Sequence, residues 1–403
     1  MTTRPVDPPI RPSKPVLVPL LLTIALFSVV AVLTLAPPTR LLRRLHRLAV
    51  RPITRLLGRI PLPSAFEEPS NLAISISSYS AYSRDQQLAI DRKLLAFERM
   101  PHRHRRIGRT LGWEQTLLRA EDAIESNSTL TDELAAIGLE RARRQGVPYG
   151  FRSKLRTESG RVVETLKHFV RDWSEAGRSE REALFPPILE ALNREFPAPE
   201  TKRVLVPGCG LGRLAYEISV SGFRTVANDF SHFMSLGTDL VFYRTHTENQ
   251  HRVYPYVHSF SHQRTADNLL RSVTFPDVVP RKDVKLEFEQ GDFLTLFTQD
   301  ESFDAIVTLF FIDTASNLLD YFETIWRLLK PNGIWINEGP LLYYGNPGME
   351  LPLEEVIRAA EKIGFKLEQR RTLNRVNYTA DELGMYTFSY DCEFWIARKP
   401  SLQ

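Results

Sequence analysis

The strongest hydrophobic pattern in the chain is an uncharged apolar run near its N-terminus. Residues 16–36 read VLVPLLLTIALFSVVAVLTLA. At about 1.5 Å per residue, a helix of this length spans the roughly 30 Å hydrocarbon layer of a bilayer. The run is longer than the usual core of a signal peptide, and the prolines at 37 and 38 would hinder cleavage after Ala36. The pattern predicts a single transmembrane helix rather than a signal peptide or a buried helix.

The polar segments on either side of this run differ in charge. The tail over residues 1–15 carries three basic residues and Asp7, whereas residues 37–59 carry seven arginines and no acidic residue. By the positive-inside tendency, the C-terminal body of a single-pass membrane protein would face the cytosol. The arginines suit either an interfacial helix on anionic lipid or a solvated basic stretch. Residues 60–84 are rich in Ser and Pro, so 37–84 is predicted to be a basic juxtamembrane segment and linker.

Two kinds of periodicity follow. Residues 85–200 show helical spacing of apolar positions and predict a helical N-terminal region. Residues 201–403 instead alternate short apolar strands with helices, which is typical of an α/β domain. The predicted strands lie at residues 203–207, 225–227, 284–290, 303–313, 334–337 and 393–398. An insertion over 231–290 is longer than an ordinary connection, which favours a substrate lid.

Composition and charge narrow the class of protein. With 403 residues, 43% hydrophobic and 25% charged, the chain must contain a globular core. The net charge of +4 comes from residues 1–60, which hold ten basic residues and one acidic residue, so the body is mildly acidic. An acidic body argues against nucleic acid as a partner. Two cysteines, Cys209 and Cys392, exclude a disulfide framework, and no metal site is expected.

The richest candidate chemistry lies in a glycine loop after the first predicted strand. The loop reads Gly208-Cys209-Gly210-Leu211-Gly212-Arg213 and precedes a predicted helix, an order that places backbone N–H groups beside a ligand. Arg213 stands where a dinucleotide motif needs its last glycine, which disfavours NAD. Asp229 ends the next strand, where a carboxylate can accept hydrogen bonds from ribose hydroxyls.

Two further acids end predicted strands of the same sheet. Asp292 and Phe293 follow the strand at 284–290 and could contact an adenine. Asp313 ends the apolar run 303–313, at the edge of the sheet where α/β proteins bind ligands. A helix N-cap or a turn residue is the structural alternative for Asp313.

Five segments are more specific than this pattern. They are LKHFVRDWSEAGRSERE (166–182), VLVPGCGLGRLAYEIS (204–219), YPYVHSFSHQRTAD (254–267), FFIDTASNLLDYFETIWRLLKPNGIWINEGPLLYY (310–344) and YDCEFWIARKP (390–400). Together they resemble the carnosine N-methyltransferase family of class I S-adenosylmethionine-dependent methyltransferases. The resemblance covers about residues 160–400 and implies a Rossmann-like, mostly parallel sheet of seven strands with a last antiparallel strand. It does not cover residues 1–84.

The resemblance also implies the site. The positions that match cofactor contacts, with Gly210 added from the glycine loop, are His168, Arg171, Gly208, Gly210, Asp229, Asp292, Phe293 and Leu309. Familiar members carry glutamine at the position of His168 and cysteine at that of Leu309. The substrate side matches Asp313 and Tyr390, with Tyr344 in place of a histidine and Phe388 in place of a second tyrosine.

The activity that the resemblance implies is methylation of the imidazole of carnosine, a histidine-containing dipeptide, with S-adenosylmethionine as the donor. Asp313 would accept the N–H of one ring nitrogen and so leave the lone pair of the other free for the methyl group. Tyr344 and Phe388 keep two other acceptors open, another small-molecule nitrogen or a protein histidine. A non-catalytic membrane-anchored scaffold is the alternative from a different class. The expected partners are a small molecule and the membrane, and a homodimer stays open.

Overall fold

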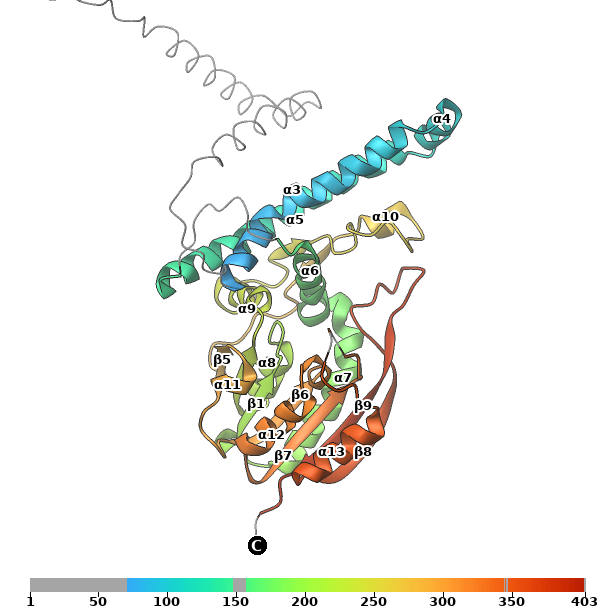
Figure 1. The fold of residues 1–403 in the computed structure, drawn as a ribbon. Coiled ribbons are helices and arrows are strands. Elements are labelled where there is room, and N and C mark those ends of the chain that lie inside the picture. The colour runs from blue at the N-terminus through green and yellow to red at the C-terminus, as the bar shows by residue number, and fades with distance from the viewer. Residues whose placement is uncertain (1–70, 148–156, 344, 346, 402–403) are drawn as a thin grey trace, which may run out of the picture. The chain divides into compact units, whose positions relative to one another are not determined.

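A mixed sheet of seven strands forms the centre of the protein in this computed structural model, which describes residues 71–147, 157–343, 345 and 347–401 (Figure 1). Its order is β5-β2-β1-β6-β7-β9-β8. The strands are β1 (Arg203–Pro207), β2 (Arg224–Asp229), β5 (Leu286–Gln290), β6 (Phe303–Leu309), β7 (Leu329–Gly339), β8 (Lys366–Asn377) and β9 (Ser389–Arg398). Strand β9 pairs antiparallel with β7 and β8, while the pairs among the other five strands are parallel. The predicted α/β sheet of seven strands with an antiparallel last strand is confirmed.

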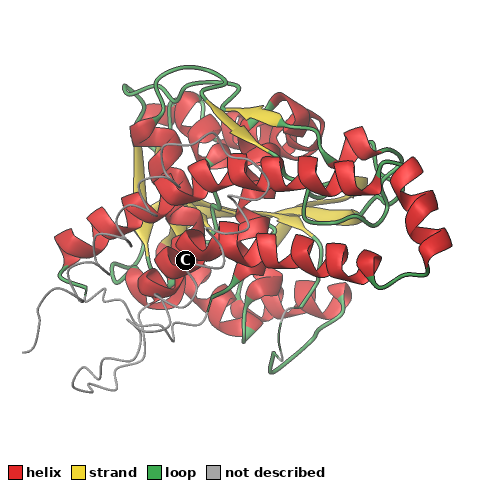
Figure 2. Cartoon of the chain, turned by 90° about the horizontal axis from the view of Figure 1, so that it is seen from above, coloured by secondary structure: helices red, strands yellow, loops and turns green. Residues whose placement is uncertain are grey.

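Helices cover both faces of this sheet, as Figure 2 shows. On one face, α7 (Arg178–Glu195) and α8 (Arg213–Val220) pack on apolar side chains of the strands. On the other face, α12 (Leu318–Leu328) and α13 (Leu353–Ile363) do the same. Since β6 is covered on both faces, six of its seven residues are buried, which explains its near-continuous apolar sequence.

The four helices over residues 71–173 form a separate layer with part of the insertion. The long helices α3 (Asn71–Glu98) and α5 (Trp113–Gln145) pack on each other and are joined by α4 (His102–Thr110) at the tip of the hairpin (Figure 1). Helix α6 (Ser159–Trp173) lies between this hairpin and the sheet. The insertion contributes α9 (His232–Asp239), a π-helical turn (Leu240–Arg244), a two-stranded sheet of β3 (His251–Val253) and β4 (Val273–Phe275), and α10 (Ala266–Leu269). Side chains of these parts other than α4, which has no buried residue, share one apolar core.

The linker predicted up to residue 84 is wrong for residues 71–84, which form the first half of α3. Two serines there satisfy their hydroxyls within the helix, because Ser75 and Ser78 donate to the carbonyl oxygens four residues earlier, at 3.0 and 2.7 Å. The side chains of Ile76, Tyr79 and Tyr82 are buried at helical spacing. The high serine content therefore concealed a helix period that these three residues carry.

The membrane part of the predicted fold also requires correction. None of the helices in the described residues is long and apolar enough to cross a bilayer. Even α5, with 33 residues, carries charged side chains along its length. The predicted transmembrane helix over 16–36, with the tail 1–15 and the basic segment from residue 37, lies outside the described residues. A single-pass membrane fold, a body held at the membrane facing the cytosol, and the membrane as a partner are thus not supported.

Candidate functional site

The glycine loop after β1 has the backbone conformation that its sequence predicts. Gly208, Gly210 and Gly212 have φ angles of +65°, +57° and +81°, a region that residues with a Cβ rarely adopt. A Cβ on Gly208 would in addition lie 2.4 Å from the ring of Phe311. The N–H groups of Cys209, Gly210 and Gly212 already have acceptors within the protein. The loop leads directly into α8, so the start of this helix is the part of the backbone that can face a nucleotide-type ligand.

Asp229 ends β2 beside this loop. Its Oδ2 accepts the N–H of Gly210 at 2.8 Å, and its Oδ1 accepts the N–H of Ser231 at 2.8 Å. Burial raises the pKa of Asp229 to about 6, against the opposing effect of these two hydrogen bonds. Each carboxylate oxygen keeps a further lone pair, so Asp229 can accept the hydroxyls of a ribose as the sequence predicts.

Helix α6 carries two predicted cofactor residues and brings one of them, Arg171, to the same loop. Arg171 Nε donates to Asp172 Oδ1 at 2.7 Å, and both side chains lie 3.8 Å from the position of a Cβ on Gly210. His168 is buried, and its Nδ1 has no hydrogen-bond partner among the described residues. Burial, followed by the charge of Arg171, lowers the pKa of His168, so its ring is neutral at pH 7. A buried nitrogen without a partner is what a site built for a polar ligand leaves open.

The other predicted cofactor residues lie at neighbouring strand ends. Asp292 is exposed and caps the short helix α11 (Phe293–Leu296), because its Oδ1 accepts the N–H of Leu294 at 3.0 Å. Phe293 packs in the core, with ring centroids 5.5 Å from Phe311. Its contact with an adenine stays a prediction. Leu309 ends β6 and lines, with Gly208, a cavity of about 30 Å³ under the glycine loop.

A second and larger cavity, of about 700 Å³, opens beside α6 and the end of β6. We call it the acceptor pocket. Its lining comes from α6, from residues 255–263 of the insertion, from residues 310–314 after β6, and from residues 378–390. The candidate substrate residues Asp313, Phe388 and Tyr390 all lie in it, whereas Tyr344 lies outside the described residues.

Asp313 occupies a short 3-10 turn (Ile312–Thr314) rather than the N-cap of α12. Asn317 is that cap, and its side chain accepts the N–H of Leu319 at 3.2 Å, so the N-cap alternative for Asp313 is wrong, whereas its position agrees with the turn alternative. Asp313 is 5% exposed, and its Oδ2 accepts the N–H of Leu342 at 2.8 Å. Burial raises the pKa of this carboxyl to about 6. The site therefore holds a carboxylate that is ionised at pH 7 and poorly hydrated.

Two lining residues were missed in the sequence. Tyr378 lines the pocket, with its ring centroid 4.8 Å from that of Phe310 and 5.2 Å from the guanidinium of Arg171. Lys167 is half-buried, and it is the one Lys or Arg among the described residues that line the pocket. No signal in the sequence marks either, because α6 and the segment after β8 meet only in the folded chain.

The charges of the pocket are otherwise balanced. Asp381 pairs with Arg271, and Glu164 lies 3.6 Å from Arg161. Lys167 forms no ion pair with any described residue. The acceptor pocket thus presents one ammonium group without a counter-charge, in addition to the carboxylate of Asp313.

Two segments close the pocket over this chemistry. We call residues 254–271 the insertion wall and residues 378–388 the C-terminal wall. The N–H of Met385 donates to the carbonyl oxygen of His262 at 2.7 Å, and Asn268 Nδ2 donates to that of Leu383 at 3.0 Å. The predicted lid in the insertion therefore forms a wall that is hydrogen-bonded to a distant part of the chain.

Comparisons with known proteins agree on one family. The family model described as "Carnosine N-methyltransferase" matches residues 152–401. The "Carnosine N-methyltransferase" of Mus musculus is 39% identical over 252 residues, which are 60% of this chain and 63% of that protein. That of Schizosaccharomyces pombe is 38% identical over 263 residues, 59% of this chain and 70% of that protein. The matched part is thus less than two thirds of the mouse protein.

Solved structures give weaker matches. The "Phosphoethanolamine N-methyltransferase 2 in complex with S-adenosyl-L-methionine" of Haemonchus contortus is 16% identical, with a TM-score of 0.35, over 59% of this chain and 60% of that chain. A structural similarity at this level gives no information about the site.

Proposed function

The chain belongs to the carnosine N-methyltransferase family, and on this premise we propose that it transfers a methyl group to an imidazole nitrogen of carnosine or a related histidine-containing small molecule. The family resemblance noted in the sequence is confirmed, and the cofactor of this domain is S-adenosylmethionine. The observation that carries the proposal is the buried carboxylate of Asp313 in the acceptor pocket. Asp313 follows Phe311 by two residues, and the ring of Phe311 lies next to Gly208 of the glycine loop.

The residues around the glycine loop fit this cofactor. Asp229 offers lone pairs for a ribose, and the unpartnered Nδ1 of His168 offers a buried polar contact. Arg171 and Asp172 are held together next to Gly210. When bound, S-adenosylmethionine supplies an electrophilic methyl group on a sulfonium, so the protein mainly has to orient the acceptor and exclude water.

Asp313 performs the orientation in this proposal. A neutral imidazole has one N–H and one lone pair, and its reference pKa is about 6.5, so it needs no strong base at pH 7. The carboxylate accepts the N–H, which fixes the tautomer and leaves the other nitrogen's lone pair for the methyl group. It then stabilises the positive charge that develops on the ring, in a place where little water competes.

Lys167 supports a small acceptor with a carboxylate of its own. A histidine-containing dipeptide with a free C-terminus carries a negative charge a few bonds from its imidazole, whereas a histidine inside a protein chain does not. The unpaired ammonium of Lys167 would meet that charge. A carboxylate bound to a half-buried lysine gains more than an exposed ion pair would.

One observation favours the second candidate, a histidine within a peptide chain. The mouth of the acceptor pocket exposes three large apolar side chains, Leu342, Tyr386 and Phe388, at 45%, 56% and 39%. A bound peptide would cover them, and a dipeptide would leave most of this surface exposed.

A methylation assay with the full chain separates these acceptors. The substrates are carnosine, its C-terminal amide, and a peptide with an internal histidine, with the product identified by mass. We expect kcat/KM to be highest for carnosine, about tenfold lower for the amide, and about tenfold lower for carnosine in the Lys167→Met variant. The matched change at exposed Lys362 on α13 should have no effect.

Preference for the peptide would replace the small-molecule proposal with the second candidate. Calorimetry with S-adenosylmethionine covers the remaining alternative: a chain that does not bind it would be a scaffold, and the proposed activity would be rejected.

A further inference from the structure

A chain of hydrogen bonds links the N-terminal helices to the acceptor pocket. Tyr82 on α3 lies 2.6 Å, from Oη to Nε2, from His258, whose ring lines the pocket. Asn127 on α5 donates from Nδ2 to Tyr82 Oη at 2.9 Å. Asn127 also bonds both backbone groups of Tyr254: it donates to the carbonyl oxygen at 3.1 Å and accepts the N–H at 2.7 Å. We call these four residues the Tyr82–His258 network.

The partners fix the direction of every bond in this network. His258 Nδ1 lies 3.2 Å from the carbonyl oxygen of Pro255, which can only accept. The proton of a neutral His258 is therefore on Nδ1, and Nε2 accepts the hydroxyl proton of Tyr82. Tyr82 Oη in turn accepts from Asn127. One tautomer of His258 satisfies every group, and neither ring nitrogen remains free for a ligand.

The network is inaccessible to water at its centre. Tyr82 and Asn127 are both buried, at 1% and 0% exposure. A buried hydroxyl or amide that loses its partner costs free energy, so the turn from Tyr254 to His258 has one favoured position. That turn begins the insertion wall, which bonds the C-terminal wall at its other end. The helices α3 and α5 thus hold the pocket wall without touching the pocket themselves.

We propose that Tyr82 and Asn127 are positioning residues for the methyl acceptor, which act through His258 on the insertion wall. This inference rests on the proposed function for its kinetic readout only. It extends the acceptor site to α3 and α5, which contribute no residue to the lining of the pocket.

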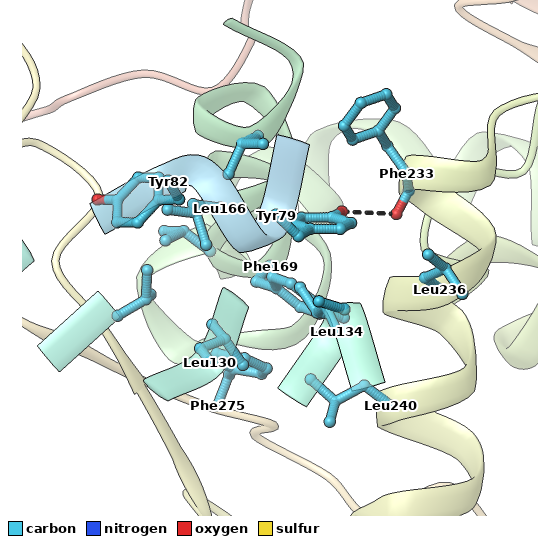
Figure 3. Close-up of a cluster of buried hydrophobic side chains, with 14 of the residues drawn as sticks. Tyr79, Tyr82, Leu130, Leu134, Leu166, Phe169, Phe233, Leu236, Leu240 and Phe275 are labelled. Carbon is cyan, nitrogen blue, oxygen red and sulfur yellow. Dashed lines mark hydrogen bonds between the residues drawn. The ribbon is translucent and has the colours of Figure 1, made fainter. Parts of the chain in front are cut away.

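The same helix provides a matched control. Tyr79 is also buried, and its hydroxyl donates to the carbonyl oxygen of Phe233 on α9 at 2.9 Å. Figure 3 shows Tyr79 and Tyr82 on α3 with their hydroxyls pointing to opposite sides. Tyr79→Phe and Tyr82→Phe remove the same atom from the same helix, but only the second removes a bond to the acceptor pocket.

The test measures KM, kcat and the dissociation constant of S-adenosylmethionine for the full chain and both variants. For Tyr82→Phe we expect KM for carnosine to rise about tenfold, the loss of one buried hydrogen bond. We expect kcat to change less than about threefold and cofactor binding to stay the same. Tyr79→Phe should lower the melting temperature similarly and leave KM unchanged. Equal KM values in the two variants would overturn the inference.

A second pair of variants and a spectrum complete the test. His258→Gln keeps an acceptor for the Tyr82 hydroxyl and should retain KM better than His258→Ala; equal loss in both would count against the network. Two-bond ¹H–¹⁵N NMR of the wild-type chain should show His258 protonated on Nδ1, and an Nε2-protonated ring would overturn the proposal. This spectrum needs no methyl transfer, so it separates a failure of the inference from a failure of the proposed function.

Discussion

Burial raises the pKa of half-buried Asp229 and of buried Asp313 to about 6, but the two acids lie in halves of the site that are built differently. Asp229 is held by backbone N–H groups of its own loop and of the glycine loop. Asp313 faces a pocket whose walls come from α6, the insertion and the C-terminal wall. The cofactor half therefore depends on local backbone conformation, and the acceptor half depends on long-range assembly.

The largest expected effect comes from the acceptor half. Asp313→Ala removes the group that orients the imidazole and stabilises its charge, and we expect kcat/KM to fall by about 10³-fold or more. The dissociation constant of S-adenosylmethionine, measured by calorimetry, should stay within about twofold because Asp229 and the loop are unchanged.

The control for this variant is Asp320→Ala. Asp320 is an exposed acid on α12 that accepts a hydrogen bond from Asn317 at 2.9 Å. It should keep full activity. If Asp313→Ala retained turnover, Asp313 would not be the group that orients the acceptor, and the proposed division between a cofactor half and an acceptor half would be contradicted.

Gly208→Ala, in the cofactor half, should impair binding of the cofactor, which Asp313→Ala leaves unchanged. The added Cβ would meet the Phe311 ring at 2.4 Å on a backbone with φ of +65°. We expect cofactor affinity to weaken about 100-fold, equivalent to about 3 kcal/mol of strain and clash.

Gly160 on α6 provides the comparison, because no atom lies within 4 Å of its added Cβ. Gly160→Ala should stabilise the helix by about 0.5–1 kcal/mol and leave cofactor binding unchanged. Binding of S-adenosylmethionine that survives Gly208→Ala would contradict a cofactor half set by backbone conformation.

Between pH 7 and pH 6, the effect of pH on methyl transfer should be smaller than the effects of Asp313→Ala and Gly208→Ala. A carboxyl with a pKa raised to about 6 is protonated below that pH and can no longer accept the N–H of the acceptor. At saturating cofactor we expect kcat/KM to level off above pH 7 and to fall about tenfold per unit just below pH 6.5, where the imidazole of the acceptor is protonated. Below pH 6, where Asp313 is protonated as well, the fall should approach about 100-fold per unit. A pH-rate profile of carnosine methylation checks this. A fall that stays at about tenfold per unit down to pH 5, as expected from protonation of the imidazole alone, would exclude Asp313 as the orienting group.

The smallest effect is expected at Glu338, on β7 between the halves. Both of its carboxyl oxygens are buried without a hydrogen-bond partner among the described residues, and burial raises its pKa to about 9. Glu338→Leu should stabilise the protein by about 1–2 kcal/mol in urea unfolding.

The stability gained by Glu338→Leu should depend on pH. Since the folded pKa lies above the unfolded one, the wild-type chain loses stability as pH rises from about 5 to 9, so the gain should be larger at pH 8.5 than at pH 5. Activity should change little. A loss of stability, or a loss of activity as large as that of Asp313→Ala, would show that Glu338 serves a ligand.

The two halves also differ in how well the sequence predicted them. The glycine loop and Asp229 could be predicted because each depends on residues close together in the chain. The sheet of seven strands was implied by the family resemblance. In the acceptor pocket, Asp313 could be predicted because it ends an apolar strand run, whereas Tyr390 was named only by the family resemblance. Lys167 and Tyr378 could not be predicted, since their neighbours are fixed by tertiary packing.

The N-terminal region shows the same limit. Serine content led to a linker prediction for residues that form α3, and the buried spacing of Ile76, Tyr79 and Tyr82 was the signal that was overlooked. The hydrogen bond from Tyr82 to His258 joins residues 176 positions apart. No local pattern predicts such a contact.

The insertion wall and the C-terminal wall have one property in common. Neither contributes a strand to the central sheet, and the two walls bond mainly to each other and to the flanking helices. Mutations in the two walls can accumulate without disturbing the strand pairing that positions the glycine loop. The methyl acceptor can accordingly change during evolution while the methyl donor stays the same. Proteins of this architecture can therefore differ in substrate and share one cofactor-binding sheet.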